Sequence, residues 1–181
     1  QYGGPAAFKV RAVVAATGSP SWGVYAGYEL FEHVAVKPGS EEYLDSEKYQ
    51  IKIRDWDGAA AEGRTLAPYL TRLNEVRRAH PALQLLRNVT IHSSDDENVL
   101  TFSKSATRED GTTDTVIVVV NLDPHGARET MVHLDLPALG REWHDTVAVH
   151  DEITGADWTW GQHNYVRLDP SEPAHVLSVR S

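Results

Sequence analysis

The fold of this chain is decided by the stretch Thr115-Val116-Ile117-Val118-Val119-Val120-Asn121-Leu122. It holds the longest uninterrupted aliphatic run of the sequence, and β-branched residues of this kind favour strands. The run is far shorter than the roughly 20 apolar residues that a membrane-spanning helix needs. We therefore predict a β-strand at residues 115–122 and no transmembrane segment.

Further β-type segments accompany this strand from residue 89 to the C-terminal end. Turn signals such as Asp110-Gly111 and Thr154-Gly155 separate them. Short strands at this spacing are typical of an antiparallel β-sandwich. The expected segments are residues 89–92, 99–105, 130–134, 146–150, 158–160, 165–168 and 174–179.

The chain before Leu86 has a different pattern, which predicts two helices with one short strand between them. Residues 6–17 are almost entirely apolar, so this helix would be buried nearly all round. Residues 65–79 repeat apolar side chains at helical spacing until His80-Pro81 ends the pattern. Residues 22–27 form a short apolar run, for which we expect a buried strand.

This first part of the chain cannot bury its own faces, because one strand between two helices is not a sheet. It either docks on the β-module or forms the end of a larger α/β domain that lies upstream. The polar stretch 28–63 contains several tyrosines, which are unusual in a solvated linker. We therefore expect this stretch to be an ordered loop that carries a site.

Composition excludes several classes of function. The chain has 17 Lys and Arg against 26 Asp and Glu, and its net charge of −9 argues against a nucleic-acid or anionic-membrane binder. The absence of cysteine excludes disulfides, thiolate metal sites and cysteine nucleophiles. The 9 histidines show no metal-binding spacing such as H-x-H, so we predict no metal site.

Three segments resemble enzymes of the α-amylase superfamily. Similarity to their last barrel strand is carried by Pro20-Ser21-Trp22-Gly23-Val24-Tyr25-Ala26-Gly27-Tyr28-Glu29. Similarity to the end of their eighth barrel helix is carried by Leu73-Asn74-Glu75-Val76-Arg77-Arg78-Ala79-His80-Pro81-Ala82-Leu83. The loop resembles one branch of this superfamily, the bacterial maltosyltransferases, in Glu41-Glu42-Tyr43-Leu44-Asp45-Ser46-Glu47-Lys48-Tyr49 and in Arg54-Asp55-Trp56.

The resemblance implies an α/β part followed by an all-β part. Residues 1–86 would be the C-terminal end of a (β/α)₈ TIM barrel, and residues 87–181 an antiparallel β-sandwich domain. Enzymes of this branch transfer maltosyl units, with retention, from α-maltose 1-phosphate to the non-reducing end of α-1,4-glucans. The resemblance implies no cofactor and a cytoplasmic location. Its partners would be these two substrates and the upstream part of the barrel, with a homodimer as one option.

The resemblance also assigns the candidate site residues. The catalytic Asp and Glu of the family lie on earlier barrel strands, and we find no match to their motifs, so no catalytic residue is expected in this chain. The isolated chain is predicted to be inactive. Lys48 and Tyr49 match the family's Lys-Tyr pair in the donor-sugar pocket, where they make polar contacts to a glucosyl unit. For Glu29 we expect a structural carboxylate, and for Trp56 a buried anchor of the loop.

Two alternatives remain open at the level of sequence. The chain would be a stand-alone carbohydrate-binding or interaction module if Trp143, Trp158 and Trp160 formed a binding surface. Trp158 and Trp160 would share one strand face, although alternating aromatic residues in a sandwich more often belong to the core. The other alternative is the C-terminal part of a different amylase-family hydrolase or branching enzyme.

Overall fold

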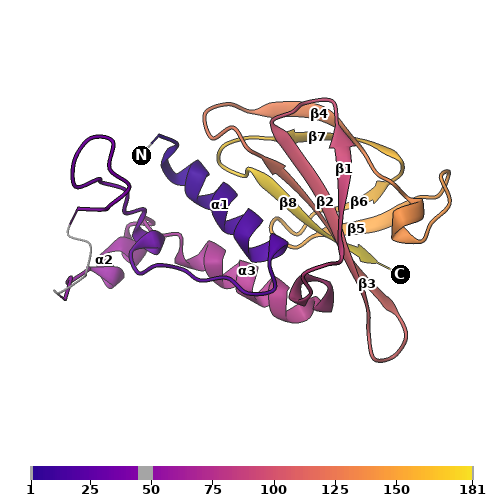
Figure 1. Cartoon of the computed structure of the whole chain (residues 1–181), viewed down its shortest axis with the longest axis horizontal. Helices are drawn as coiled ribbons and strands as arrows, with labels where there is room; N and C mark the ends of the chain where they lie inside the picture. The colour runs from indigo at the N-terminus through magenta and orange to yellow at the C-terminus, as the bar shows by residue number, and fades with distance from the viewer. Residues whose placement is uncertain (1, 45–50, 181) are drawn as a thin grey trace.

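A computed structural model of the chain describes residues 2–44 and 51–180. Within these residues an eight-stranded, wholly antiparallel sheet forms most of the molecule (Figure 1). Its strands confirm the predicted segments, with ends that differ by at most two residues. They are β1 (Val89–Ser94), β2 (Val99–Thr107), β3 (Thr113–Asn121), β4 (Arg128–His133), β5 (Val147–Asp151), β6 (Asp157–Trp160), β7 (His163–Leu168) and β8 (Ala174–Arg180).

The strand order is β6-β5-β8-β3-β2-β1-β4-β7, and β1 is the point at which the sheet folds over on itself. The first part of β1 pairs with β2, whereas Ser93 and Ser94 pair with β4. The β4–β7 pair therefore forms a second layer over the sheet of the other strands. The predicted antiparallel sandwich is confirmed.

The central strand β3 is buried on both faces. Val116, Val118 and Val120 belong to a core cluster that also contains helical residues. Ile117 and Val119 belong to a second cluster, which fills the space between the two sheet layers. Because successive side chains of a strand point to opposite faces, a strand covered on both sides must be apolar at every position. This explains the uninterrupted aliphatic run.

Two helices cover the outer face of the larger layer, as Figure 1 shows. These helices are α1 (Gly4–Gly18) and α3 (Ala67–Ala79). The chain also contains three short 3₁₀ helices, which are η1 (Tyr28–Leu30), η2 (Pro81–Gln84) and η3 (Pro137–Leu139). Val13 of α1 and Leu73 of α3 share the core cluster with β3. Arg77 of α3 donates to the carbonyl oxygens of Ala16 and Ser19, which end α1. The helical part therefore docks on the β-module.

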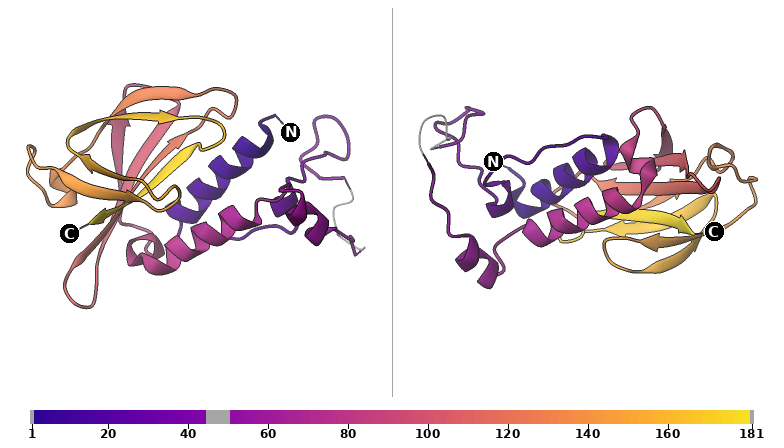
Figure 2. Two further views of the ribbon diagram at one scale, coloured as in Figure 1. Left: turned by 180° about the vertical axis from the view of Figure 1, so that it is seen from behind. Right: turned by 90° about the horizontal axis from the view of Figure 1, so that it is seen from below.

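Two expectations for the region between these helices were wrong. Residues 22–27 form no strand, and Tyr25 is 56% exposed. A strand needs a hydrogen-bonding neighbour, and none lies beside this segment among the described residues. The stretch expected to be a loop contains a short helix, α2 (Trp56–Ala61). Figures 1 and 2 show the region around α2 extending away from the sheet.

No helix in the described part of the chain has the length and apolar character required to cross a bilayer.

Candidate functional site

The candidate site is the loop that joins η1 to α2. The predicted donor-sugar residues, Lys48 and Tyr49, fall in the part of this loop outside the described residues. The chain leading to them is held by a short two-stranded ladder. The amide of Leu44 donates to the carbonyl of Val34 at 2.7 Å, and the amide of Val36 donates to the carbonyl of Glu42 at 2.8 Å.

The chain that follows is held by Glu32. Arg54 Nε lies 2.8 Å from one carboxylate oxygen of Glu32, and Lys52 Nζ lies 3.1 Å from the other. The hydrogen bond from Arg54 lowers the pKa of Glu32 despite partial burial. Arg54 Nη2 also donates to the carbonyl of Ala26 at 3.2 Å. The chain on both sides of residues 45–50 is therefore held by contacts to residues 26–36.

Gly27 permits this arrangement because the Glu32 carboxylate lies against its α-carbon. A β-carbon at position 27 would meet Oε2 of Glu32 at 2.3 Å. The backbone there has φ +100°, a conformation that residues with a β-carbon rarely adopt. The backbone conformation thus favours glycine, and a β-carbon would also force the Glu32 carboxylate to shift.

Replacing Gly27 with alanine should displace Glu32 and loosen the loop. We expect hydrogen exchange at Lys52 and Arg54 to accelerate, with a loss of about 1–2 kcal/mol in unfolding free energy from the backbone alone. The matched control is Gly39→Ala, because Gly39 has φ +76° but open space around its α-carbon. Equal exchange at Lys52 and Arg54 in the two variants would contradict the role assigned to the Glu32 contact.

Other residues of this region have structural roles. The Glu29 carboxylate accepts a hydrogen bond from the Gly27 amide at 3.1 Å, which confirms the structural role predicted for it. Asp55 caps α2 by accepting from the Gly58 amide at 2.8 Å. The expected burial of Trp56 was wrong, because its side chain is 45% exposed and lies under the Arg54 guanidinium.

A cavity of about 320 Å³ lies between this loop and the start of α1. Its lining combines the rings of Phe8, Tyr28 and Tyr43 with the polar groups of Arg11 and His33. The Tyr28 hydroxyl donates to the carbonyl of Phe8 at 2.6 Å, and burial raises the pKa of Tyr28 to about 12. Tyr28 therefore remains neutral, and the cavity offers apolar ring faces beside hydrogen-bonding groups.

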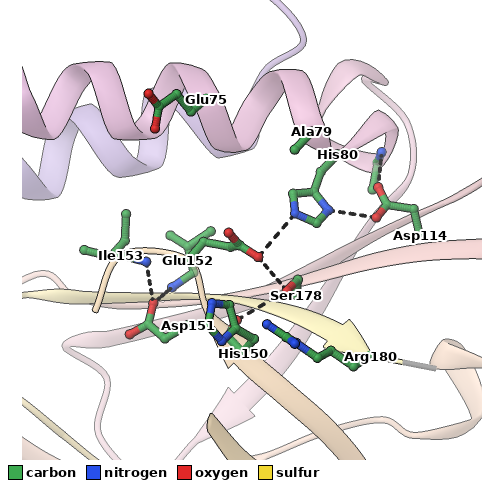
Figure 3. Close-up of polar contacts among 12 residues, drawn as sticks. Glu75, Ala79, His80, Asp114, His150, Asp151, Glu152, Ile153, Ser178 and Arg180 are labelled. Carbon is green, nitrogen blue, oxygen red and sulfur yellow. Dashed lines mark hydrogen bonds and ion pairs between the residues drawn. The ribbon is translucent and has the colours of Figure 1, made fainter. Parts of the chain in front are cut away.

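A cluster of polar side chains, which the sequence did not predict, joins the helices to the sheet (Figure 3). His80 lies between two carboxylates: its Nδ1 is 2.8 Å from Asp114, and its Nε2 is 3.5 Å from Glu152. Glu152 also accepts from Arg72 and Ser178, at 3.0 and 2.7 Å. We call these five residues the polar junction.

The polar junction contains serine, histidine and carboxylates, but its geometry is not that of a nucleophilic triad. In such a triad the hydroxyl donates to the imidazole. Here the Ser178 hydroxyl donates to Glu152, and the facing nitrogen of His80 approaches Glu152 instead. The side chains of His80 and Asp114 are also almost completely buried. The arrangement attaches the helices to the sheet.

Acidification should weaken the fold through two buried carboxylates, Asp114 and Asp151. Burial raises the pKa of each carboxylate, but hydrogen bonds outweigh it, so both pKa values are lowered. The donors to Asp114 are His80 and the Ala82 amide. The donors to Asp151 are His175, Thr154 and the Ile153 amide. A lowered folded-state pKa contributes stability above the unfolded pKa of about 4, which is lost as the pH falls through the folded value. We expect the urea midpoint to fall steadily below about pH 4. A midpoint that rises there would contradict this assignment.

The tryptophans do not form a shared platform. Trp160 is 5% exposed and belongs to the core between the sheet layers, whereas Trp158 and Trp143 are 39% and 52% exposed. Trp158 instead packs edge-on against His175, with ring centroids 5.2 Å apart. Trp160, one of the residues on which the binding-module interpretation depended, therefore belongs to the sandwich core.

The fold is similar to that of part of a solved α-amylase. A solved α-amylase from Geobacillus thermoleovorans, complexed with acarbose, matches 96% of this chain with a TM-score of 0.58 and 14% sequence identity. The match covers 33% of that enzyme. Similarity at this level of identity concerns the fold alone.

The family follows from sequence comparison. Residues 91–179 match the family model described as "GLGE, C-terminal". Over 99% of its length the chain is 56% identical to α-1,4-glucan:maltose-1-phosphate maltosyltransferase 2 of Streptomyces coelicolor, and 55% and 51% identical to the enzymes of that name from Mycolicibacterium smegmatis and Mycobacterium tuberculosis. The chain is thus similar to these maltosyltransferases over nearly its whole length, and residues 91–179 match the C-terminal family model. It spans about a quarter of their length, between 25% and 26%.

Proposed function

We propose that this chain is part of a cytoplasmic maltosyltransferase of α-glucan biosynthesis. The complete enzyme would transfer maltosyl units from α-maltose 1-phosphate to the non-reducing end of α-1,4-glucans, with retention and release of phosphate. The observation that carries this proposal is the identity of 51–56% to the named enzymes, which extends through the helical segment as well as the sandwich.

Residues 1–86 would complete the C-terminal end of a TIM barrel, with residues 87–181 as the sandwich domain. Exposed apolar side chains support this division. Ile51 and Ile53 are 95% and 94% exposed, and Val34 and Tyr25 are 58% and 56% exposed. Side chains this apolar and this exposed fit a surface that another part of the protein would cover. Residues 22–27 would gain strand neighbours from the upstream barrel.

Lys48 and Tyr49 would contact the donor sugar. The fixed chain on either side supports this role, because a binding residue on a loop needs a rigid base. The Lys ammonium group offers three donors to sugar hydroxyls, and Tyr combines an apolar ring face with a polar hydroxyl. No catalytic nucleophile or acid/base is assigned to this chain, so the chemical step would belong to residues outside it.

A chimeric enzyme tests the proposal. In the Streptomyces coelicolor enzyme that is 56% identical, the aligned quarter would be replaced by this chain. We expect the chimera to release phosphate from α-maltose 1-phosphate in the presence of an α-1,4-glucan, and the isolated chain to release none. A folded chimera that does not bind either substrate and does not release phosphate would overturn the proposal.

Within the active chimera, Lys48→Ala should reduce kcat/KM by about 10-fold to 100-fold, because a hydrogen bond to the bound sugar is lost. The control is Lys37→Ala, an exposed lysine of the same loop. Steady-state phosphate release measures both variants. Indistinguishable kinetics for the two variants would remove Lys48 from the donor site and leave the assignment of the enzyme intact.

A further inference from the structure

Two histidines meet on the outer face of the β4–β7 pair. His133 and His163 are directly opposite each other in the strand register. Their Nδ1 atoms are 2.7 Å apart, and their rings meet edge to face. The His133 side chain is 29% exposed, and His163 is exposed, so solvent reaches the pair.

Asp95 fixes the proton of one ring. Its carboxylate lies 2.8 Å from Nε2 of His133. A carboxylate oxygen only accepts, so a neutral His133 carries its hydrogen on Nε2 and presents a lone pair from Nδ1. That lone pair points toward Nδ1 of His163. A carboxylate on the far nitrogen of an imidazole is the arrangement that orients histidine ligands in metal sites.

We propose that His133 and His163 form a surface binding site for a divalent transition metal ion, with Asp95 as the orienting carboxylate. Neutral imidazole nitrogens suit Zn²⁺, Cu²⁺ and Ni²⁺, whereas Mg²⁺ and Ca²⁺ prefer oxygen ligands. The site has two protein ligands, because no three His, Asp or Glu side chains of the described residues converge on one point. Water completes the coordination.

The geometry requires only a small adjustment to admit the ion. Two nitrogens that are each about 2.0–2.1 Å from zinc in a tetrahedral site lie about 3.3 Å apart. The present separation of the two Nδ1 atoms is 2.7 Å. Rotation of the exposed His163 ring widens this separation, while Asp95 keeps the His133 ring in place. In the metal-free protein the His163 nitrogen donates to His133, and binding replaces that hydrogen with the metal ion.

Isothermal titration of the 181-residue chain with ZnCl₂ tests the proposal, with MgCl₂ as the metal control. We expect one Zn²⁺ to bind and Mg²⁺ to give no heat above dilution. His163→Ala should weaken Zn²⁺ binding at least 10-fold, and Asp95→Asn should weaken it about 10-fold by disturbing the orientation of His133. His125→Ala is the matched control, because His125 is an exposed histidine in the loop between β3 and β4. It should leave the affinity unchanged.

Because all three substituted side chains are partly or fully exposed, the variants should fold, which far-UV circular dichroism checks. Equal Zn²⁺ affinity in the parent chain and in His163→Ala would overturn the proposal. Equal weakening by His163→Ala and His125→Ala, or no Zn²⁺ binding at all, would do the same. Loss of binding confined to the His163 and Asp95 variants would establish the site.

Discussion

Asp151→Ala is expected to lower the free energy of unfolding by about 3–5 kcal/mol, because it removes a buried carboxylate that accepts several hydrogen bonds. The Asp151 side chain is fully buried and accepts from His175, Thr154 and two backbone amides, at 2.8–3.2 Å. Alanine would leave these donors without their acceptor, and the Val176 amide among them is buried away from water. For a chain of this size the melting temperature should fall by roughly 10 °C.

Urea denaturation at pH 7 measures this effect, and Asp157→Ala is the matched control. Asp157 also pairs with a histidine, His150, at 2.9 Å, but its side chain is 69% exposed. An exposed pair of this kind contributes about 0–1 kcal/mol. If the two alanine variants unfolded at the same urea concentration, the buried hydrogen bonds of Asp151 would not stabilise the fold as we infer.

Asp114→Ala is expected to have the second large effect, about 3 kcal/mol, and to act on the attachment of the helices. Asp114 accepts from His80 at 2.8 Å, from the Ala82 amide at 2.9 Å and from Arg108 at 2.7 Å. These three donors come from the end of α3, from η2 and from the β2–β3 turn. Without Asp114, α3 and η2 should separate from the sheet more readily, and amide hydrogen exchange at the end of α3 should accelerate.

The control for this variant is Glu129→Ala. Glu129 also accepts two side-chain hydrogen bonds, from Tyr165 at 2.8 Å and Arg167 at 2.9 Å, but this pair of strands exposes all three side chains to water. Its loss should cost less than about 1 kcal/mol and leave exchange in α3 unchanged. Unchanged α3 exchange in Asp114→Ala would show that the polar junction does not hold the helices.

Elements whose pattern is local were predictable. The run at 116–120 indicated a strand, and the apolar spacing of residues 65–79 indicated the helix that α3 confirms. Segment 22–27 is also short and largely apolar but forms no strand, because strand formation depends on a hydrogen-bonding neighbour. A strand pattern therefore predicts a capacity to pair, and the neighbour decides whether pairing occurs.

Charged residues in the core were not predictable. Lys104 lies in a strand with polar neighbours and would be expected at the surface, yet it is fully buried. Its ammonium group donates to the carbonyl of Leu85 at 2.6 Å, and burial lowers its pKa. His80, Asp114 and Glu152 are separated by more than 30 residues in the chain, so no local motif connects them.

The sequence by itself determined the β-sandwich, its two accompanying helices and the resemblance to maltosyltransferases, because these follow from residue patterns within single segments. Only the tertiary structure decided that β3 is covered on both faces, that the helices attach through the polar junction, and that Glu32 holds the loop against Gly27. It also brought together His133 and His163, which are 30 residues apart. The physical reason is that hydrophobic periodicity acts over a few residues, whereas burial, ion pairing and close backbone approach depend on which distant segments meet.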